Sequence, residues 1–374
     1  MNIVVNARLL LKDYLEGMGN FLAETMKIIC IQHPEHHFIF VFDRPYDEHF
    51  IFSDNITPVV AGPPARHPLL WKYWFDVKIP AILRKYKADV FVSSDGFCSL
   101  ATKRPQCLVI HDLAFLHDDS YLKKSYTGFY KKYTPKFLNK ARSIATVSEF
   151  SKKEIVDHYQ VDAAKIDVVY NGVKEVFQPV SEKDKQVIKE KYTGGAEYFL
   201  YTGSIHPRKN LMNLLKAFSI FKKRLKSNLK LVIAGRLAWK YESFVESLKT
   251  YKYRSDVVLT GYLPEEELAL LTASAYAMVY PSFIEGFGVP VAEAMKCGVQ
   301  VITTLHSAMQ EVCGEAGLYA EAQNFNDIAD KMMLIYKDEV LRKQLVDKGR
   351  ELVKKYSWQT TANLFWQTIL KAVD

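Results

Sequence analysis

Several sequence patterns that commonly mark an enzyme class are missing from this chain of 374 residues. There is no G-x-x-x-x-G-K-[ST] segment, so a P-loop nucleotidase is unsupported. There is no Asp-x-Asp either, which argues against a carboxylate-bound magnesium ion that carries a diphosphate. The 5 cysteines form no C-x-x-C pair, and such thiols are typical of a reduced, cytoplasmic protein.

Long apolar runs are also missing. No stretch of about 18 apolar residues occurs, so no segment is predicted to span a bilayer. The opening residues MNIVVNARLL have no basic segment before their apolar run, and we expect a strand there instead of a signal peptide. A net charge of +8 suits an acidic ligand or an anionic membrane surface, and it is too small to indicate nucleic acid.

What the sequence does contain is a regular alternation of apolar, strand-length runs with helical segments. This alternation predicts parallel sheets covered by helices on both faces, a doubly wound α/β fold. The length of the chain predicts two domains, and a turn and linker near residues 171–180 place the boundary between them. We expect two Rossmann-like domains, 1–178 and 179–356, with a ligand cleft between them. The final helix, 357–374, is expected to pack back onto the first domain. The expected strands are 2–8, 37–43, 56–62, 89–95, 106–112, 143–148 and 166–170, then 198–204, 229–235, 256–261, 275–280, 299–303 and 317–320.

Helices are predicted from the loop at residues 16–20 to about residue 31, at 67–87 and at 122–141, and Ser151 with Glu154 fits a capping box that starts the next helix. The segments at 67–87 and 122–141 are basic and aromatic: residues 121–142 hold seven Lys or Arg, six aromatics and no acid. Either could touch an anionic membrane surface or a lipid-linked diphosphate. The alternative is an amphipathic helix with its aromatics on the sheet and its lysines in water.

The most informative stretch is residues 275–306, AYAMVYPSFIEGFGVPVAEAMKCGVQVITTLH. It reads as strand, glycine-rich turn, helix and strand, which is a parallel βαβ unit. The turn joins the carboxyl end of a strand to the amino end of a helix, where free N–H groups favour an anion. Glu285 begins the turn and Glu293 lies about two helical turns further on. We therefore expect a binding site in which two glutamates meet one ligand at different depths.

A second candidate is YTGSIHPRKN, residues 201–210, which follows the first strand of the second domain. Gly203 permits a close approach, and Arg208 and Lys209 precede the next helix. Cations are disfavoured at a helix start unless an anion binds there, and a guanidinium with an ammonium group suits a diphosphate. The alternative is a pair of solvated surface charges.

Two weaker signals lie in the first domain. His111 ends the strand QCLVIHD, where it could bind a sugar hydroxyl or act as an acid or base; alternatively it is a structural residue at the strand end. Gly17 and Gly19 form a lone G-x-G, which is equally typical of an ordinary turn.

The spacing Glu285-x7-Glu293 within EGFGVPVAEAMKCGVQVI resembles the retaining glycosyltransferases of family 4, which have the two-domain GT-B fold. Other segments resemble motifs of the same family, and they occur in the same order along nearly the whole chain. They are the Gly17/Gly19 loop, IHDLAF, TVSEFSKKEI, VVYNGV, YTGSIHPRKNL, LTGYLPEEEL and YSWQTTA.

The resemblance implies a nucleoside diphosphate-sugar donor bound mainly to the second domain. Glu293 would hold the ribose, Arg208 and Lys209 the diphosphate, and Glu285 the donor sugar, with His111 facing the same sugar. Family members commonly carry an arginine after the glycine that corresponds to Gly203, and this chain has Ser204 instead. Neutralisation of the diphosphate charge would then depend on Arg208 and Lys209. No metal or other cofactor is expected. The implied donor contacts also include Gly17, Gly19, Gly203, Ser204, Tyr262, Leu263, Gly286, Phe287 and Gly288.

These observations predict a cytoplasmic, retaining, metal-independent hexosyltransferase of the mannose or glucose type, with GDP-mannose favoured as donor. The acceptor would be a glycan or a lipid-linked sugar in polysaccharide or glycolipid synthesis, and contact with an anionic membrane stays open. The expected mechanism is front-face transfer, in which the leaving phosphate takes the proton of the acceptor. The alternatives are a sugar-nucleotide epimerase or phosphorylase on the same fold, and a non-catalytic nucleotide-sugar binding subunit.

Overall fold

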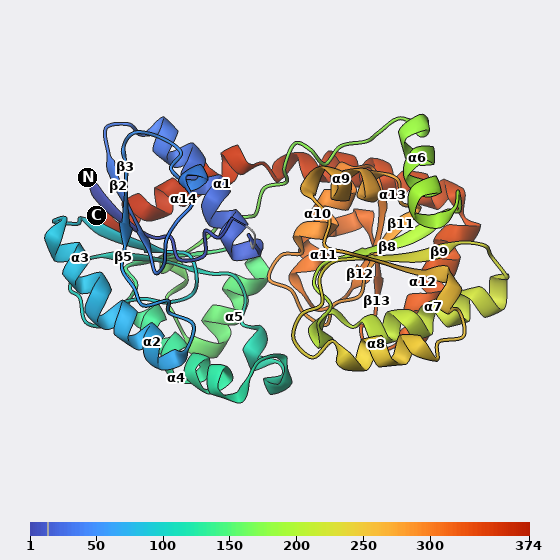
Figure 1. Ribbon diagram of the computed structural model, residues 1–374, viewed down its shortest axis with the longest axis horizontal. Helices are drawn as coiled ribbons and strands as arrows, with labels where there is room; N and C mark the ends of the chain where they lie inside the picture. Colours follow the sequence, from blue (N-terminus) through green and yellow to red (C-terminus); the bar gives the residue numbers. More distant parts are fainter. Residues whose placement is uncertain (13–14) are drawn as a thin grey trace. The chain divides into compact units, whose positions relative to one another are not determined.

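A computed structural model describes residues 1–12 and 15–374. The described residues form two compact units (Figure 1). Unit 1 contains residues 1–172 and 357–374, and unit 2 contains residues 173–356. Each unit is built on one parallel sheet, and these two doubly wound α/β units confirm the predicted fold class.

Unit 1 has a seven-stranded sheet in the order β3-β2-β1-β4-β5-β6-β7, with all neighbouring strands parallel. Most strand residues are buried apolar side chains, because helices pack on both faces of the sheet (Figure 1). The strands are β1 (Asn2–Asn6), β2 (His37–Phe42), β3 (Ile56–Val60), β4 (Val90–Ser93), β5 (Gln106–Ile110), β6 (Ser143–Thr146) and β7 (Ile166–Val168). The helices are α1 (Gly17–Gln32), α2 (Pro68–Tyr73), η2 (Trp74–Lys78), α3 (Ile79–Lys85), α4 (Lys124–Lys140), α5 (Glu149–Tyr159) and α14 (Trp358–Val373), with short turns η1 (Glu48–Phe50), η3 (Ala114–Leu116), η4 (Asp119–Tyr121) and η5 (Ala163–Lys165).

Unit 2 has a six-stranded parallel sheet in the order β10-β9-β8-β11-β12-β13. The strands are β8 (Tyr198–Thr202), β9 (Lys230–Ala234), β10 (Val257–Gly261), β11 (Ala277–Tyr280), β12 (Gln300–Thr304) and β13 (Gly317–Ala320). The helices are α6 (Glu182–Thr193), α7 (Leu211–Leu225), α8 (Glu242–Lys249), α9 (Glu265–Ala273), α10 (Val289–Lys296), α11 (Ala308–Cys313), α12 (Phe325–Lys337) and α13 (Glu339–Leu352), with short turns η6 (Pro207–Lys209), η7 (Arg254–Asp256), η8 (Gly314–Ala316) and η9 (Val353–Lys355).

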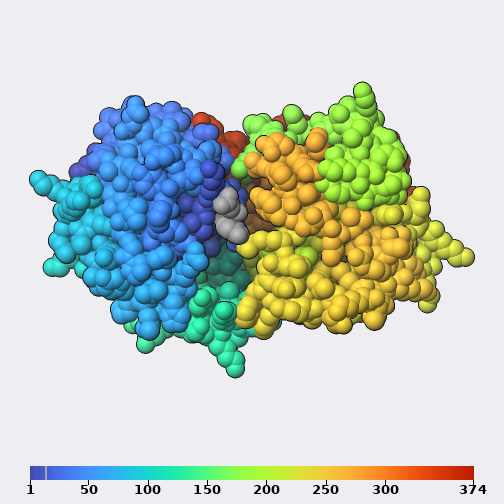
Figure 2. Space-filling view, viewed as in Figure 1, coloured from blue at the N-terminus to red at the C-terminus, as the bar shows by residue number. Residues whose placement is uncertain are grey.

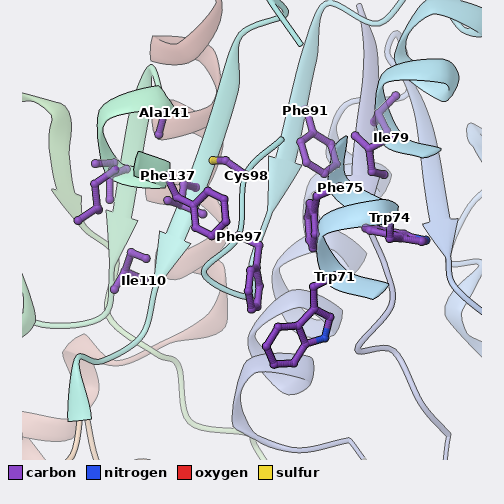
Figure 3. Close-up of a cluster of buried hydrophobic side chains, with 14 of the residues drawn as sticks. Trp71, Trp74, Phe75, Ile79, Phe91, Phe97, Cys98, Ile110, Phe137 and Ala141 are labelled. Atoms are coloured by element: carbon purple, nitrogen blue, oxygen red, sulfur yellow. The ribbon is translucent and has the colours of Figure 1, made fainter. Parts of the chain in front are cut away.

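The predicted helix 67–87 is divided into α2, the π-helical segment η2 and α3. Three aromatic residues of this region, Trp71, Trp74 and Phe75, are buried in the core of unit 1 (Figure 3). The indole N–H of Trp71 donates to the Ala65 carbonyl (2.7 Å), and that of Trp74 donates to the Ala61 carbonyl (2.8 Å). The spacing i, i+3 and i+4 places these three residues on one face of the helix, so all three rings reach the core.

The predicted capping box at Ser151 and Glu154 is wrong. Helix α5 begins at Glu149, and its N-cap is Ser148, whose hydroxyl accepts from the Ser151 N–H (3.0 Å). Ser148 suits this position because it lies two residues beyond the end of β6 with its backbone still extended (φ −163°, ψ 158°), as N-cap residues usually are. Glu154 instead contacts His117 through its carboxylate.

The last helix of the chain, α14, packs on α1 and on the strands β4 to β7 of unit 1. Its residues Ala362, Phe365 and Ile369 are fully buried. The Ser143 hydroxyl donates to the Thr368 carbonyl (2.7 Å), which joins β6 to this helix. The chain passes from unit 1 to unit 2 at Val173 and returns to unit 1 at Ser357.

Candidate active site

The sheet of unit 2 reverses its order between β8 and β11, since β9 and β10 lie on one side and β12 and β13 on the other. At such a point the loops that leave the carboxyl ends of the two strands diverge, and open α/β sheets bind their ligands there. The loop after β8 is residues 203–210, and the loop after β11 is residues 281–288. These are the two segments that the sequence singled out.

The loop after β8 is a defined turn. The His206 Nδ1 atom accepts from the Arg208 N–H (3.1 Å) and caps the short helix η6. Asn210 follows in the left-handed region (φ +62°) and leads into α7. Arg208 and Lys209 are consequently presented on consecutive residues of a fixed turn.

Hydrogen bonds tie this turn to the loop after β11. The Phe283 N–H donates to the Arg208 carbonyl (2.9 Å), and the Asn210 side-chain amide donates to the Pro281 carbonyl (2.9 Å). From β12, the Thr303 hydroxyl donates to the Tyr280 carbonyl (2.9 Å). Two loops that are far apart in the sequence therefore form one rigid edge.

The charged side chains of the two loops meet within this edge. The Lys209 ammonium donates to a Glu285 carboxylate oxygen (2.5 Å) and to the Tyr280 hydroxyl (2.8 Å). The Arg208 guanidinium lies 3.5 Å from the other oxygen of Glu285 and donates to the Ile284 carbonyl (3.1 Å). Lys209, Glu285 and Tyr280 are buried. Two cations thus face one carboxylate, and the cluster carries a net positive charge.

The protonation state of Glu285 follows from this arrangement. Burial alone would raise the pKa of its carboxyl group, but the charges of Arg208 and Lys209 outweigh that effect and hold the pKa at about 2. Burial raises the pKa of the Tyr280 hydroxyl well above its ordinary value, so this group stays neutral and can donate. At neutral pH the cluster therefore contains one carboxylate and a neutral phenol.

Glu293 lies on α10 in a different electrostatic environment. Its half-buried carboxyl group is desolvated, and the nearby Glu265 adds to the effect, so that its pKa rises to about 8 despite the opposing charge of Lys174. Lys174 itself pairs with Glu265 (2.8 Å). The two glutamates of the motif therefore differ in charge near neutral pH.

Glycines allow the backbone at this edge to pack closely. A Cβ atom on Gly235, at the end of β9, would lie 2.0 Å from the Gly203 carbonyl oxygen, and both residues have positive φ. Gly288 has φ +92° at the start of α10, and a Cβ atom there would lie 2.8 Å from Met309. These close contacts explain the glycines through packing and conformation, independently of any ligand.

Other predicted donor residues of unit 2 are placed as follows. Ser204 is half-buried, and its carbonyl accepts from the Tyr201 hydroxyl (3.2 Å). Gly286 and Phe287 are buried, and the Phe287 ring packs edge-on against Tyr356 (5.2 Å). Tyr262 is 74% exposed after β10, and Leu263 beside it is half-buried. The Phe287 side chain is thus part of the packing of unit 2.

His111 lies in unit 1 at the carboxyl end of β5. Its Nε2–H donates to the Ser94 carbonyl (2.9 Å), and its ring packs edge-on against Phe21 (5.2 Å). Burial lowers the pKa of the imidazole. Because a carbonyl can only accept, the proton of the neutral ring is on Nε2, which leaves Nδ1 as an acceptor.

The two glycines at the start of α1 differ. A Cβ atom on Gly17 would meet open space, whereas one on Gly19 would lie 2.7 Å from the Leu9 carbonyl oxygen. Gly19 is therefore required for packing of the helix against the loop after β1. Gly17 has no such packing constraint.

Comparison with known proteins places the chain in a family. Residues 182–352 match "Glycosyl transferases group 1", and residues 31–175 match "Glycosyltransferase Family 4". The chain is 30% identical over 270 residues to the O-antigen chain mannosyltransferase RfbU of Salmonella typhimurium, covering 71% of this chain and 70% of that one. The chain belongs to the family 4 glycosyltransferases.

Two further comparisons agree with this family. The glycosyltransferase is 29% identical over 288 residues to O-antigen chain mannosyltransferase B of Escherichia coli, which covers 77% of this chain and 74% of that one. The structure of Anabaena Alr3699/HepE in complex with UDP and glucose matches 99% of both chains with a TM-score of 0.77 and 14% identity. At that identity the likeness concerns the fold, which is GT-B.

Sequence reasoning did not assign Tyr280, Asn210 or His206 of this glycosyltransferase. Tyr280 ends an apolar, strand-length run in the sequence, yet its hydroxyl accepts from the Lys209 ammonium group. Asn210 and His206 shape the turn that presents the two cations. An asparagine before a helix is a sequence signal for a left-handed residue, and it could have identified the turn.

Within residues 1–12 and 15–374 of the glycosyltransferase, no group of three His, Cys, Asp or Glu side chains is arranged to hold a metal ion. No helix of the described part of the chain is long and apolar enough to cross a membrane.

Proposed function

We propose that this family 4 glycosyltransferase moves a hexosyl group, of the mannose or glucose type, from a nucleoside diphosphate-sugar to a glycan or lipid-linked acceptor. The observation that carries the proposal is the cluster of Arg208, Lys209 and Glu285 at the strand-order reversal of unit 2. The names of the relatives favour polysaccharide synthesis and a mannosyl donor, since two of them are O-antigen chain mannosyltransferases. The buried, unpaired cysteines fit a reducing cytoplasm.

The donor would bind with its diphosphate at the turn of Arg208 and Lys209. A guanidinium can bind a phosphate through two parallel hydrogen bonds, and the ammonium group acts as a point charge. Glu293 would accept from the ribose hydroxyls. The backbone near Tyr262 and Leu263 would contact the base.

The sugar end of the donor would face Glu285 and the backbone N–H groups of residues 286–288. His111 of unit 1 would contribute a hydrogen bond to the same sugar. Its neutral ring, with Nε2–H fixed on the Ser94 carbonyl, offers the Nδ1 acceptor to a hydroxyl group. These assignments rest on the family resemblance together with the geometry of the individual residues.

We propose that the configuration of the sugar is retained by front-face transfer. The bond between the anomeric carbon and the diphosphate oxygen breaks, the bond to the acceptor oxygen forms, and the acceptor proton passes to the leaving phosphate. Glu285 already accepts from Lys209 and lies beside Arg208, which suits hydroxyl recognition better than nucleophilic attack. A glycosyl–Glu285 adduct, trapped and detected by mass spectrometry, would contradict this mechanism.

We also propose that no metal ion is required, because two cations on consecutive residues can stabilise the departing diphosphate. Glycosyl transfer should persist when a chelator is present. Loss of turnover on chelation, restored by Mg²⁺ or Mn²⁺, would contradict this part of the proposal.

Calorimetric binding of GDP, UDP and ADP without metal would test the donor site. We expect one of the three to bind well and to lose affinity in Glu293→Ala, while Glu285→Ala keeps nucleotide affinity and loses turnover. Equal loss of nucleotide affinity in both variants would show that the assigned orientation of the site is wrong. Nucleotide binding without turnover, over a panel of glycan acceptors, would instead favour a non-catalytic binding subunit.

A further inference from the structure

Tyr280, at the end of β11, contacts both the buried cation and the carboxylate of the candidate active site. Its hydroxyl accepts from the Lys209 ammonium group (2.8 Å) and donates to a Glu285 carboxylate oxygen through a long hydrogen bond (3.5 Å). A phenol hydroxyl can donate and accept at once, so one group serves both partners. Because Lys209 also donates to Glu285 (2.5 Å), the three side chains form a closed triangle.

The Tyr280 ring is held in place next to the loop after β8. It stacks on Tyr201, with 5.5 Å between the ring centres and 11° between the planes. A Cβ atom on Gly203 would lie 3.2 Å from the hydroxyl oxygen of Tyr201 and 3.8 Å from that of Tyr280. In Figure 2 the surface of unit 2 is made by its helices and loops, and the two tyrosines, at most 2% exposed, do not contribute to it. The two phenols therefore form a rigid support for this loop.

The ammonium group of Lys209 keeps one donor unused. It has three N–H groups, and Glu285 and Tyr280 accept from two of them. Within residues 1–12 and 15–374, no acceptor takes the third. The nitrogen is tetrahedral, so two fixed hydrogen bonds set the direction of the remaining N–H group. The Lys209 side chain is 11% exposed, and a ligand can therefore approach it.

Tyr280 supplies an acceptor that carries no negative charge. Burial raises the pKa of its hydroxyl well above the ordinary value, so the phenol stays neutral at working pH. A second carboxylate in its place would match the two cations, Arg208 and Lys209, with two anions and remove the net positive charge. With the neutral phenol, the cluster keeps one positive charge that can attract a phosphate group.

We propose that Tyr280 is a positioning residue, which holds the Lys209 ammonium group in the orientation that binds the diphosphate of the donor. The inference rests on the proposed function and deepens it. Glu285 is assigned to the sugar, and Lys209 bonds to Glu285, so Lys209 should meet the phosphate next to the sugar. A nucleoside monophosphate lacks this second phosphate. Tyr280 should therefore affect the binding of diphosphates and leave that of monophosphates unchanged.

Calorimetric titration of the full chain with matched nucleotide pairs tests the inference. GDP is compared with GMP, UDP with UMP and ADP with AMP, and the pair whose diphosphate binds the wild type best is used for the variants. Tyr280→Phe keeps the stacked ring and removes only the hydroxyl. We expect it to weaken diphosphate binding on the order of tenfold, the size of one hydrogen bond to a charged group, with monophosphate affinity unchanged. In a Lys209→Met background, Tyr280→Phe should have no further effect on diphosphate affinity.

Tyr198→Phe is the matched control. This buried tyrosine, at the opposite end of β8 from the turn, donates to the Leu271 carbonyl (2.6 Å), so the variant makes the same chemical change without touching Lys209. It should keep both affinities of the wild type.

Several outcomes would overturn the inference. An equal loss of diphosphate and monophosphate affinity in Tyr280→Phe would show a structural role only, and a loss in Lys209→Met that adds to that of Tyr280→Phe would show that the two residues act separately. An equal loss of diphosphate affinity in Tyr198→Phe would show that the effect is not specific to Tyr280. Diphosphate binding that Tyr280→Phe leaves intact would overturn this inference alone, whereas a wild type that binds no diphosphate would overturn the proposed function as well.

Discussion

Replacing Glu285 by glutamine removes the charge that faces Lys209 while nearly preserving the volume of the side chain. The variant leaves a buried ammonium group without its carboxylate, and loss of one partner of a buried ion pair typically costs about 3–5 kcal/mol. The pKa of Glu285 leads to a similar magnitude. It falls from its ordinary 4.5 to about 2, and these roughly 2.5 units correspond to about 3 kcal/mol.

The sign of the pH dependence follows from this lowered pKa. The ionised carboxylate stabilises the folded state above pH 4.5, and this contribution is lost as the pH falls toward about 2. The difference in stability between wild type and Glu285→Gln should therefore be about 3 kcal/mol at pH 7 and should shrink on acidification. Hydrogen exchange of the amides in β11 and β12 measures it within unit 2, without interference from unit 1.

Controls distinguish the ion pair from general damage. Lys209→Met combined with Glu285→Gln should cost less than the sum of the two single variants, because both members of the pair are then absent. Glu175→Gln removes the exposed partner of Lys296 and should change stability by less than about 0.5 kcal/mol. A stability difference that stays constant between pH 7 and pH 3 would refute the reasoning, as would additive single effects.

Two other predictions concern the same edge of unit 2. Burial raises the folded-state pKa of Glu293 to about 8, so this carboxyl group increasingly destabilises the folded state as the pH rises from 4.5 through 8. Glu293→Gln should therefore have a higher melting temperature than the wild type at pH 9 and a similar one at pH 4. Thermal melts at the two pH values check this, and an unchanged difference would contradict it. The same variant is expected to weaken nucleotide binding. Gly235→Ala should destabilise the protein by more than about 1–3 kcal/mol, since its Cβ atom would meet the Gly203 carbonyl at 2.0 Å. Gly17→Ala, where the Cβ atom meets open space, should be nearly neutral. Urea titrations of the two variants and the wild type measure both effects, and equal midpoints for the two variants would contradict the packing argument.

The βαβ unit around β11, α10 and β12 could be predicted almost to the residue. Its strands are fully buried on both faces, so they appear as continuous apolar runs, and Gly298, with φ +71°, marks the end of the helix. Local patterns of this kind depend on neighbours in the sequence. They are visible without coordinates.

The contacts inside the site were not visible in the same way. Lys209 and Glu285 lie on separate loops, and only the strand order β8-β11 brings their side chains together. Tyr280 resembles an apolar strand residue in the sequence, because the partner of its hydroxyl, Lys209, lies on the loop after the neighbouring strand β8. The helix predicted at 67–87 is confirmed as α2, η2 and α3, but the π-helical form of its middle segment η2 could not be predicted from local propensity.

Helix α14 gives the chain an unusual order of assembly. Unit 2 is inserted within unit 1, since the residues of unit 1 are 1–172 and 357–374. On the ribosome, unit 2 is complete before the helix that covers β4 to β7 has been made. Unit 1, most of which is synthesised first, is therefore the last of the two units to be completed. A chain that stopped after Tyr356 would contain all of unit 2 but would leave β4 to β7 of unit 1 without the helix that packs on them.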